Sequence, residues 1–128
     1  MNDKIITTTA APAAIGPYSQ GVRAGSLVFL SGQIPLDPAT MSVVEGGIRH
    51  QSEQVMKNLA AVTAAAGGSL DDIVKLTIFL TDLGDFTVVN DVMGEYFQPP
   101  FPARSTVQVS ALPRGAAIEI EAIMSMPG

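Results

Sequence analysis

Apolar and polar residues near the N-terminus form short stretches separated by turn-forming residues. Residues 5–8 and 26–30 are rich in β-branched and other apolar side chains, which predicts two strands. Gly25, just before the second stretch, indicates a hairpin turn. Proline and glycine mark the segments 9–20 and 33–47 as loops, so we expect short strands joined by long connections.

The period of the apolar positions changes to that of a helix at residue 48. A helix is therefore predicted over residues 48–66, and the pair Gly67-Gly68 is a typical C-terminal stop. The apolar face of this helix is made of Ile48, Val55, Leu59 and Val62.

Residues 73–80 are nearly all apolar and predict a strand. One face of this strand should be covered by core and the other by a partly polar surface. We expect one face to carry Val74, Leu76, Ile78 and Leu80, and the other to carry Ile73, Lys75, Thr77 and Phe79.

A second helix is predicted next, and it must end before Pro99 and Pro100 because proline does not continue a helix. Asp85 or Thr81 is the expected N-cap. The apolar positions of this helix are Phe86, Val89, Met93 and Phe97.

Alternating residues predict two final strands, over 104–109 and 118–125. The order of the elements favours an α+β fold, with one sheet and both helices on one of its faces. No linker or repeat divides the chain, so we expect a single domain over residues 1–128. The second sheet face would be left uncovered, and oligomerisation would bury its apolar residues.

Composition adds to this picture and excludes several kinds of chemistry. Charged residues make up 15% of the chain against about 25% in an average soluble domain, which is consistent with a surface buried between subunits. The formal charge of −5 argues against a nucleic-acid partner. The chain has no cysteine and a single histidine, His50, so disulfides, thiolate nucleophiles and sites with two imidazoles are excluded.

No membrane or nucleotide signal is found in the sequence. No apolar run approaches the length of a membrane-spanning helix, and the first residues lack the basic and apolar regions of a signal peptide. Glycine-rich phosphate-binding motifs are also missing. We therefore expect a cytoplasmic protein without a membrane partner.

Two charged residues lie in predicted strands, and the strand around Glu119 is strongly apolar. Arg104 opens one predicted strand, and Glu119 lies inside another. They can form a structural ion pair. Alternatively, a carboxylate-binding guanidinium can face a general acid/base carboxylate, which suits chemistry on a small keto or imino acid. These residues alone leave both interpretations open.

Three residues near predicted loops have equally open interpretations. Tyr18 follows Gly16-Pro17 and fits either an aromatic packed on a turn or a binding site. Ser31 and Gly32, at a strand end, can present a hydroxyl and a free N–H to a ligand. They also fit an ordinary transition from strand to turn.

Six short blocks form a pattern that is more specific than any one of them. They follow one another in a fixed order over essentially the whole chain. The blocks are 13–20 (AAIGPYSQ), 31–38 (SGQIPLDP), 72–75 (DIVK), 90–92 (NDV), 101–105 (FPARS) and 112–122 (LPRGAAIEIEA).

In this order and spacing, the blocks resemble the RidA/YjgF family. The resemblance implies a chorismate-mutase-like α+β fold with a mixed sheet, assembled as a homotrimer with a barrel-like core and clefts between subunits. It also implies an enamine/imine deaminase, which hydrolyses 2-aminoacrylate and related 2-imino acids to 2-oxo acids and ammonia. Family members use no metal or organic cofactor, so none is expected here.

The resemblance also implies three catalytic residues. Arg104 matches the arginine that clamps the substrate carboxylate. Glu119 matches the carboxylate that orients or activates the attacking water and passes a proton to the leaving amine. Tyr18 matches a tyrosine of the cleft.

Four further positions match residues that approach the ligand. Ser31 and Asn90 match side chains near it, and Gly32 and Thr106 match backbone contacts. Several family members have cysteine where this chain has Thr106, and a backbone contact is compatible with that change. The segment between Asn90 and Arg104 is shorter than in some members, which affects the expected substrate size and not the chemistry.

Two other classes of function are alternatives. Some family members are described as endoribonucleases that inhibit translation, but the charge of −5 counts against RNA binding here. The other alternative is a non-enzymatic protein, either a sensor of small carboxylates or a chaperone. Carboxylate binding without turnover would indicate the sensor.

Overall fold

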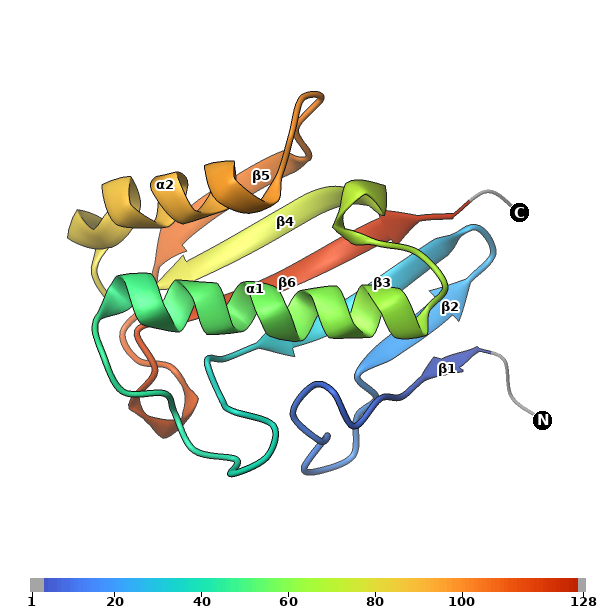
Figure 1. Ribbon diagram of the computed structural model, residues 1–128, viewed down its shortest axis with the longest axis horizontal. Helices are drawn as coiled ribbons and strands as arrows, with labels where there is room; N and C mark the ends of the chain where they lie inside the picture. Colours follow the sequence, from blue (N-terminus) through green and yellow to red (C-terminus); the bar gives the residue numbers. More distant parts are fainter. Residues whose placement is uncertain (1–3, 127–128) are drawn as a thin grey trace.

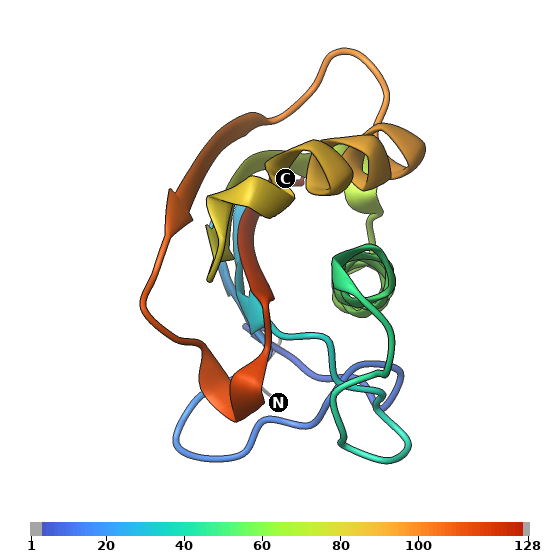
Figure 2. The same cartoon turned by 90° about the vertical axis from the view of Figure 1, so that its left-hand side faces the viewer.

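Two helices cover one face of a six-stranded sheet in the computed structural model, which describes residues 4–126 (Figures 1 and 2). The predicted α+β class and the position of both helices on one face are therefore confirmed. The elements are β1 (Ile5–Ile6), β2 (Gly21–Ala24), β3 (Leu27–Gln33), α1 (Ile48–Ala65), β4 (Ile73–Leu80), α2 (Phe86–Tyr96), β5 (Ala103–Gln108) and β6 (Ile118–Ser125).

The sheet is mixed, with the strand order β1-β2-β3-β6-β4-β5. All neighbours are antiparallel except β4 and β5, which run parallel because α2 connects them. The hairpin between β2 and β3 turns at Gly25, whose φ of 63° suits glycine. β5 is thus an edge strand, next to α2.

The first helix ends as its sequence predicts. Gly67 has a φ of 95°, and the N–H of Gly68 donates to the carbonyl of Thr63 at 3.0 Å. Arg23 on β2 adds a hydrogen bond from Nη2 to the carbonyl of Ala66 at 2.8 Å. The predicted apolar face is confirmed, because Val55, Leu59 and Val62 are fully buried and Ile48 packs against the same core.

The predicted faces of β4 are wrong at the start of the strand. Ile73 is buried and Val74 is exposed, the reverse of simple alternation with Leu76. The cause is a bulge, because Ile73 and Lys75 of β4 pair with the consecutive residues Met124 and Ile123 of β6. The extra residue turns Val74 away from the core.

Asp85, one of the two predicted N-cap residues, occupies the N-cap position of α2, but its side chain makes no capping hydrogen bond. A short 3-10 turn, Leu83–Asp85, precedes the helix, and Asp82 caps this turn by accepting a hydrogen bond from the N–H of Gly84 at 2.8 Å. Helical spacing alone does not reveal such a turn.

Two buried amide side chains hold the long loops in place. Gln20 accepts a hydrogen bond from the N–H of Thr8 at 2.7 Å and donates to the carbonyl of Pro12, also at 2.7 Å. Asn58 on α1 donates to the carbonyl of Leu36 at 3.0 Å. These loops line one of the pockets described below, so Gln20 and Asn58 set its shape.

We expect Asn58→Leu to lower the free energy of unfolding by about 1–3 kcal/mol, because the carbonyl of Leu36 loses the buried hydrogen bond that the Asn58 side chain donates to it. Urea unfolding at fixed protein concentration measures the change. Lys57→Ala, at an exposed position next along α1, is the control and should change stability by less than about 0.5 kcal/mol. A loss for Asn58→Leu no larger than the control's would contradict this role.

The sheet face away from the helices is open (Figure 2). It exposes apolar side chains, with Phe29 and Val107 each 43% exposed. Among residues 4–126, no helix combines the length and apolar character that crossing a membrane requires. The cytoplasmic location stays a prediction.

Candidate functional site

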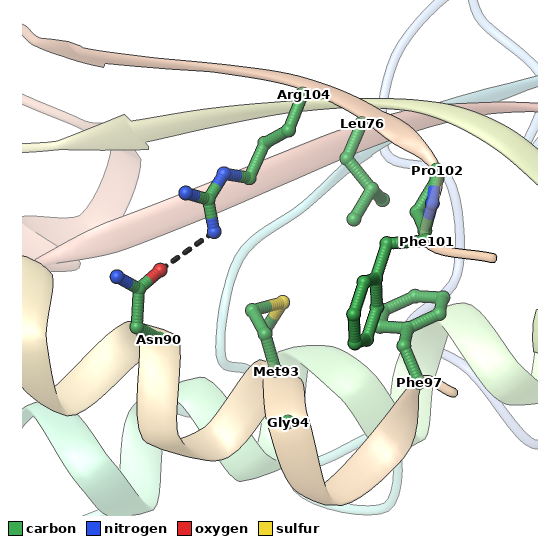
Figure 3. Close-up of a pocket in the computed structure, with 8 residues that line it drawn as sticks. All are labelled: Leu76, Asn90, Met93, Gly94, Phe97, Phe101, Pro102 and Arg104. Carbon is green, nitrogen blue, oxygen red and sulfur yellow. Dashed lines mark hydrogen bonds between the residues drawn. The ribbon is translucent and has the colours of Figure 1, made fainter. Parts of the chain in front are cut away.

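Arg104 lies on β5, and its side chain extends toward α2 (Figure 3). It pairs across the sheet with Leu76, which is buried under the helices, so Arg104 is on the helix-covered face. Its Nη1 donates to Oδ1 of Asn90 at 2.6 Å, and its guanidinium carbon lies 5.2 Å from the centre of the Phe86 ring. The hydrogen bond and the cation–π contact together orient the guanidinium.

The guanidinium borders a pocket of about 420 Å³ between α2, β5 and the segment that joins them. Arg104 and Asn90 form its polar end, and Phe97 and Phe101 form its aromatic end (Figure 3). Within residues 4–126 Arg104 makes no ion pair, so the structural bridge to Glu119 is absent. The charge of Arg104 is available to an anionic ligand.

Glu119 lies on β6 and faces the opposite side of the sheet. It pairs with Phe79 of β4, between the buried residues Ile118 and Ile120. Burial raises the pKa of the Glu119 carboxyl, and the nearby charge of Glu121 raises it further. No side chain or backbone group within residues 4–126 hydrogen-bonds to this carboxyl. A carboxyl with a raised pKa holds a proton more readily than an ordinary glutamate, which suits a general acid/base.

The carboxyl of Glu119 lies against a bulge in β3. Ser31 and Gly32 lie between Leu30 and Gln33, opposite one residue of β6. A Cβ at position 32 would overlap Oε2 of Glu119 and lie 2.9 Å from its carboxyl carbon. Gly32 is therefore needed for space, since its φ is not in the left-handed region.

Tyr18 and Ser31 line the same pocket as Glu119, which has a volume of about 530 Å³. The hydroxyl of Ser31 donates to the carbonyl of Ser19 at 2.5 Å, so its oxygen is left to accept a hydrogen bond. The hydroxyl of Tyr18 accepts from the N–H of Ile15 at 3.4 Å and keeps its own proton to donate. The two hydroxyls thus offer complementary contacts.

The structure divides the predicted site residues between two pockets. The Arg104 pocket contains Arg104 and Asn90, and the Glu119 pocket contains the others except Thr106. Arg104 and Glu119 are two strands apart and three residues apart along the strands, or roughly 10 Å in each direction, on opposite faces. One copy of the chain therefore does not bring both to one small substrate.

Thr106 lines neither of these pockets. It lies two residues after Arg104 on β5 and pairs with Ile78, which places it on the helix-covered face. Its hydroxyl oxygen is buried and has no hydrogen-bond partner within residues 4–126. Its predicted backbone contact with a ligand stays a prediction.

Comparison with known proteins identifies the family. The family model described as "Endoribonuclease L-PSP" matches residues 8–126. The chain belongs to the RidA/YjgF family. Its sheet, its two helices and the positions of the sequence blocks agree with membership over nearly the whole chain.

Similar RidA/YjgF proteins have different names. Protein DfrA of Myxococcus xanthus is 60% identical over 96% of this chain and 95% of its own length. A 2-iminobutanoate/2-iminopropanoate deaminase of Dermatophagoides farinae is 50% identical over 94% of both chains. The crystal structure of RidA from the Antarctic bacterium Psychrobacter sp. PAMC 21119 has a TM-score of 0.91 at 50% identity, covering 94% of this chain and 98% of its own.

The sequence did not indicate the roles of two residues of the RidA/YjgF site: Phe86, which contacts Arg104, and Gln20, which lines the Glu119 pocket. Phe86 was predicted only as an apolar helix position, and its contact with Arg104 depends on how α2 lies beside β5. Gln20 belongs to a block that carried the resemblance, but nothing in the sequence indicated that it is buried. A polar residue inside a loop gives no local signal of burial.

Proposed function

We propose that the protein is an enamine/imine deaminase that hydrolyses 2-aminoacrylate and related 2-imino acids to 2-oxo acids and ammonia. One observation carries the proposal: Arg104 and Glu119 each border a pocket, and neither forms an ion pair within residues 4–126. The identity of 50% to the deaminase of D. farinae supports the reaction type.

A second copy of the chain completes the proposed active site. The opposite positions of the two pockets support this, because one small substrate needs both Arg104 and Glu119. The open sheet face carries the exposed apolar residues Leu27, Phe29 and Val107, a surface that oligomers bury. We propose a homotrimer with a chorismate-mutase-like barrel, in which the Arg104 pocket of one copy meets the Glu119 pocket of the next.

Arg104 binds the substrate carboxylate in the proposed mechanism. Its planar guanidinium can donate two parallel hydrogen bonds to the two carboxylate oxygens. Asn90 and Phe86 fix its orientation before the substrate arrives, which lowers the entropic cost of binding. The carboxylate contact then positions the C=N carbon next to Glu119 of the neighbouring copy.

Glu119 activates the water. As a carboxylate it accepts a proton from the water while the water oxygen bonds to the carbon of the protonated imine; the C=N π electrons move to the nitrogen, which gives a neutral carbinolamine. Glu119 then returns the proton to the amine nitrogen. The C–N bond breaks as the hydroxyl proton leaves to solvent, and ammonia and the 2-oxo acid are released. The raised pKa makes the Glu119 carboxylate a stronger base in the first step, and it brings this pKa closer to that of the amine nitrogen, so one group can serve both steps.

The remaining predicted residues have supporting roles. Ser31 accepts a hydrogen bond from the imine N–H or the water, and Tyr18 donates one to an oxygen or nitrogen of the intermediate. Asn90 acts by holding Arg104. Gly32 gives Glu119 its space, and Thr106 offers a backbone contact beside Arg104.

The pH dependence of kcat/KM should reflect the pKa of Glu119. Activity falls as Glu119 is protonated, so the acid limb lies above the ordinary glutamate value of 4.5. Glu121→Gln removes a negative charge that favours the protonated form, and the acid limb should therefore move to lower pH. A pH–rate profile of both proteins measures this. An acid limb that stays in place or rises in Glu121→Gln would contradict the assignment.

Gly32→Ala should reduce deamination by at least about tenfold, which is part of the roughly 100- to 10,000-fold that a general acid/base supplies. The new methyl group displaces the carboxyl of Glu119, whose side chain is flexible enough for the fold to survive. Gly47→Ala is the control, because a Cβ at position 47 meets nothing within 4 Å. Full activity of Gly32→Ala would show that deamination does not depend on the position that the Glu119 carboxyl takes beside Gly32.

A trapping assay tests the proposed function. An amino-acid oxidase generates imino acids, and semicarbazide converts them to semicarbazones that absorb light. We expect the protein to suppress semicarbazone formation in proportion to its concentration. An unchanged rate at high protein concentration would overturn the deaminase, and binding of 2-oxo acids without turnover would then favour the sensor.

RNA cleavage is the alternative that the family description names. Three of the seven basic residues have structural roles, since Arg23 bonds to the end of α1, Arg49 pairs with Glu53 and Glu95, and Arg114 bonds to the carbonyl of Met41. With a net charge of −5 and few basic side chains left over, the protein has little positive charge with which to bind phosphates. Salt-dependent binding and cleavage of an RNA oligonucleotide would favour the ribonuclease.

A further inference from the structure

Met41 and Arg114 share a rare backbone conformation. Within residues 4–126, they are the two non-glycine residues in the left-handed region, each with a φ of 59°. They are joined to each other, because Nη1 of Arg114 donates to the carbonyl of Met41 at 3.0 Å. Such conformations persist where surrounding contacts hold them, and they are concentrated at functional sites.

Both residues line the Glu119 pocket. Ile15 and Ile34 add to the apolar part of its wall. In the proposed reaction, the substrate side chain is attached to the carbon that the water attacks, and that water is held by Glu119. The side chain must therefore lie in this pocket, against the apolar wall.

The loop that carries Met41 is closed on itself. The N–H of Met41 donates to the carbonyl of Asp37 at 2.7 Å, and the N–H of Asp37 donates to the carbonyl of Ser42 at 3.0 Å. At its base the carbonyl of Leu36 is held by Asn58 at 3.0 Å. At its tip the loop is held by Arg114, so the position of Met41 depends on this hydrogen bond.

We propose that Arg114 is a specificity-determining residue, which limits the length of the substrate side chain by holding Met41 against the Glu119 pocket. The inference rests on the proposed function, because it concerns the same pocket. It selects, among 2-imino acids, those with short side chains. Arg114 acts through Met41 and is a positioning residue that does not take part in the chemistry.

The test is a series of 2-imino acids that lengthens by one methylene at a time, made from alanine, 2-aminobutyrate, norvaline and norleucine. We expect Arg114→Ala to raise the ratio of kcat/KM for the longest over the shortest substrate by at least about threefold, which corresponds to part of one buried methylene. Its kcat for the shortest substrate should stay within about twofold of the wild type. Arg114→Lys should keep the wild-type ratio, since lysine can also donate to the Met41 carbonyl.

Arg23→Ala is the matched control. Arg23 also donates to a backbone carbonyl, that of Ala66, but it lines neither pocket. We expect Arg23→Ala to keep the wild-type ratio of kcat/KM for the longest over the shortest substrate. A parallel loss over the whole series in Arg114→Ala, or an unchanged ratio, would overturn the inference.

A binding measurement tests the role of Arg114 independently of the proposed catalytic function. Calorimetry with the matching 2-oxo acids measures the same length preference without turnover. If the wild type binds but does not deaminate, and Arg114→Ala still shifts the preference toward long side chains, the proposed function fails and the role of Arg114 stands. If the wild type binds none of these acids, both are overturned.

Discussion

Replacing Arg104 by alanine is expected to lower kcat/KM for 2-imino acids by about 30- to 1000-fold, or about 2–4 kcal/mol of transition-state stabilisation. The substrate carboxylate would lose a bidentate, charge-assisted contact, and the C=N carbon would no longer be held beside the water. The fold should survive, because Arg104 is exposed and contacts the side chains of Asn90 and Phe86. The trapping assay and circular dichroism measure the two effects.

Arg49→Ala is the control for the loss of a guanidinium. Arg49 is exposed on α1, pairs with Glu53 and Glu95, and lines neither pocket. We expect wild-type activity from this variant. If Arg104→Ala keeps more than about a third of the wild-type kcat/KM, a loss of less than 1 kcal/mol, Arg104 does not bind the carboxylate.

Glu119→Gln should lower kcat by roughly 100- to 10,000-fold, the range that a general acid/base contributes. Glutamine fills the same space beside Gly32 but neither takes nor returns a proton. Binding of a 2-oxo acid should be retained within about threefold, because the carboxylate is held by Arg104. Single-turnover kinetics and calorimetry separate the two quantities.

The control for Glu119→Gln is Glu95→Gln on the exposed surface of α2. Glu95 contacts Arg49 and lines neither pocket, so its replacement should leave kcat unchanged. A Glu119→Gln variant that loses 2-oxo acid binding, with kcat otherwise intact, would assign Glu119 to binding and not to proton transfer.

Local sequence signals predicted most of the fold. The helical period from Ile48 and the pair Gly67-Gly68 gave α1 to within one residue of its end. The alternation after residue 118 predicted β6 and its buried face. The signals failed at the start of β4 and before α2, where a bulge and a 3-10 turn depend on the neighbouring strand and on Asp82.

The candidate site was predictable as residue types but not as an arrangement. Arg104 and Glu119 stand out as charged residues in predicted strands. Their positions on opposite faces follow from the pairing of β5 with β4 and of β4 with β6, which no local pattern encodes. The contacts of Phe86 and Arg114 likewise join segments far apart in the chain.

The most direct test of the account mixes two inactive variants. Arg104→Ala and Glu119→Gln are combined in equal amounts, unfolded, refolded together and assayed for imine hydrolysis. If each site takes Arg104 from one copy and Glu119 from the next, random assembly restores about a quarter of the wild-type activity. The copy that supplies the first residue carries Arg104 in half of the sites, and the copy that supplies the second carries Glu119 in half of those. A mixture no more active than the separate variants would contradict a site shared between copies.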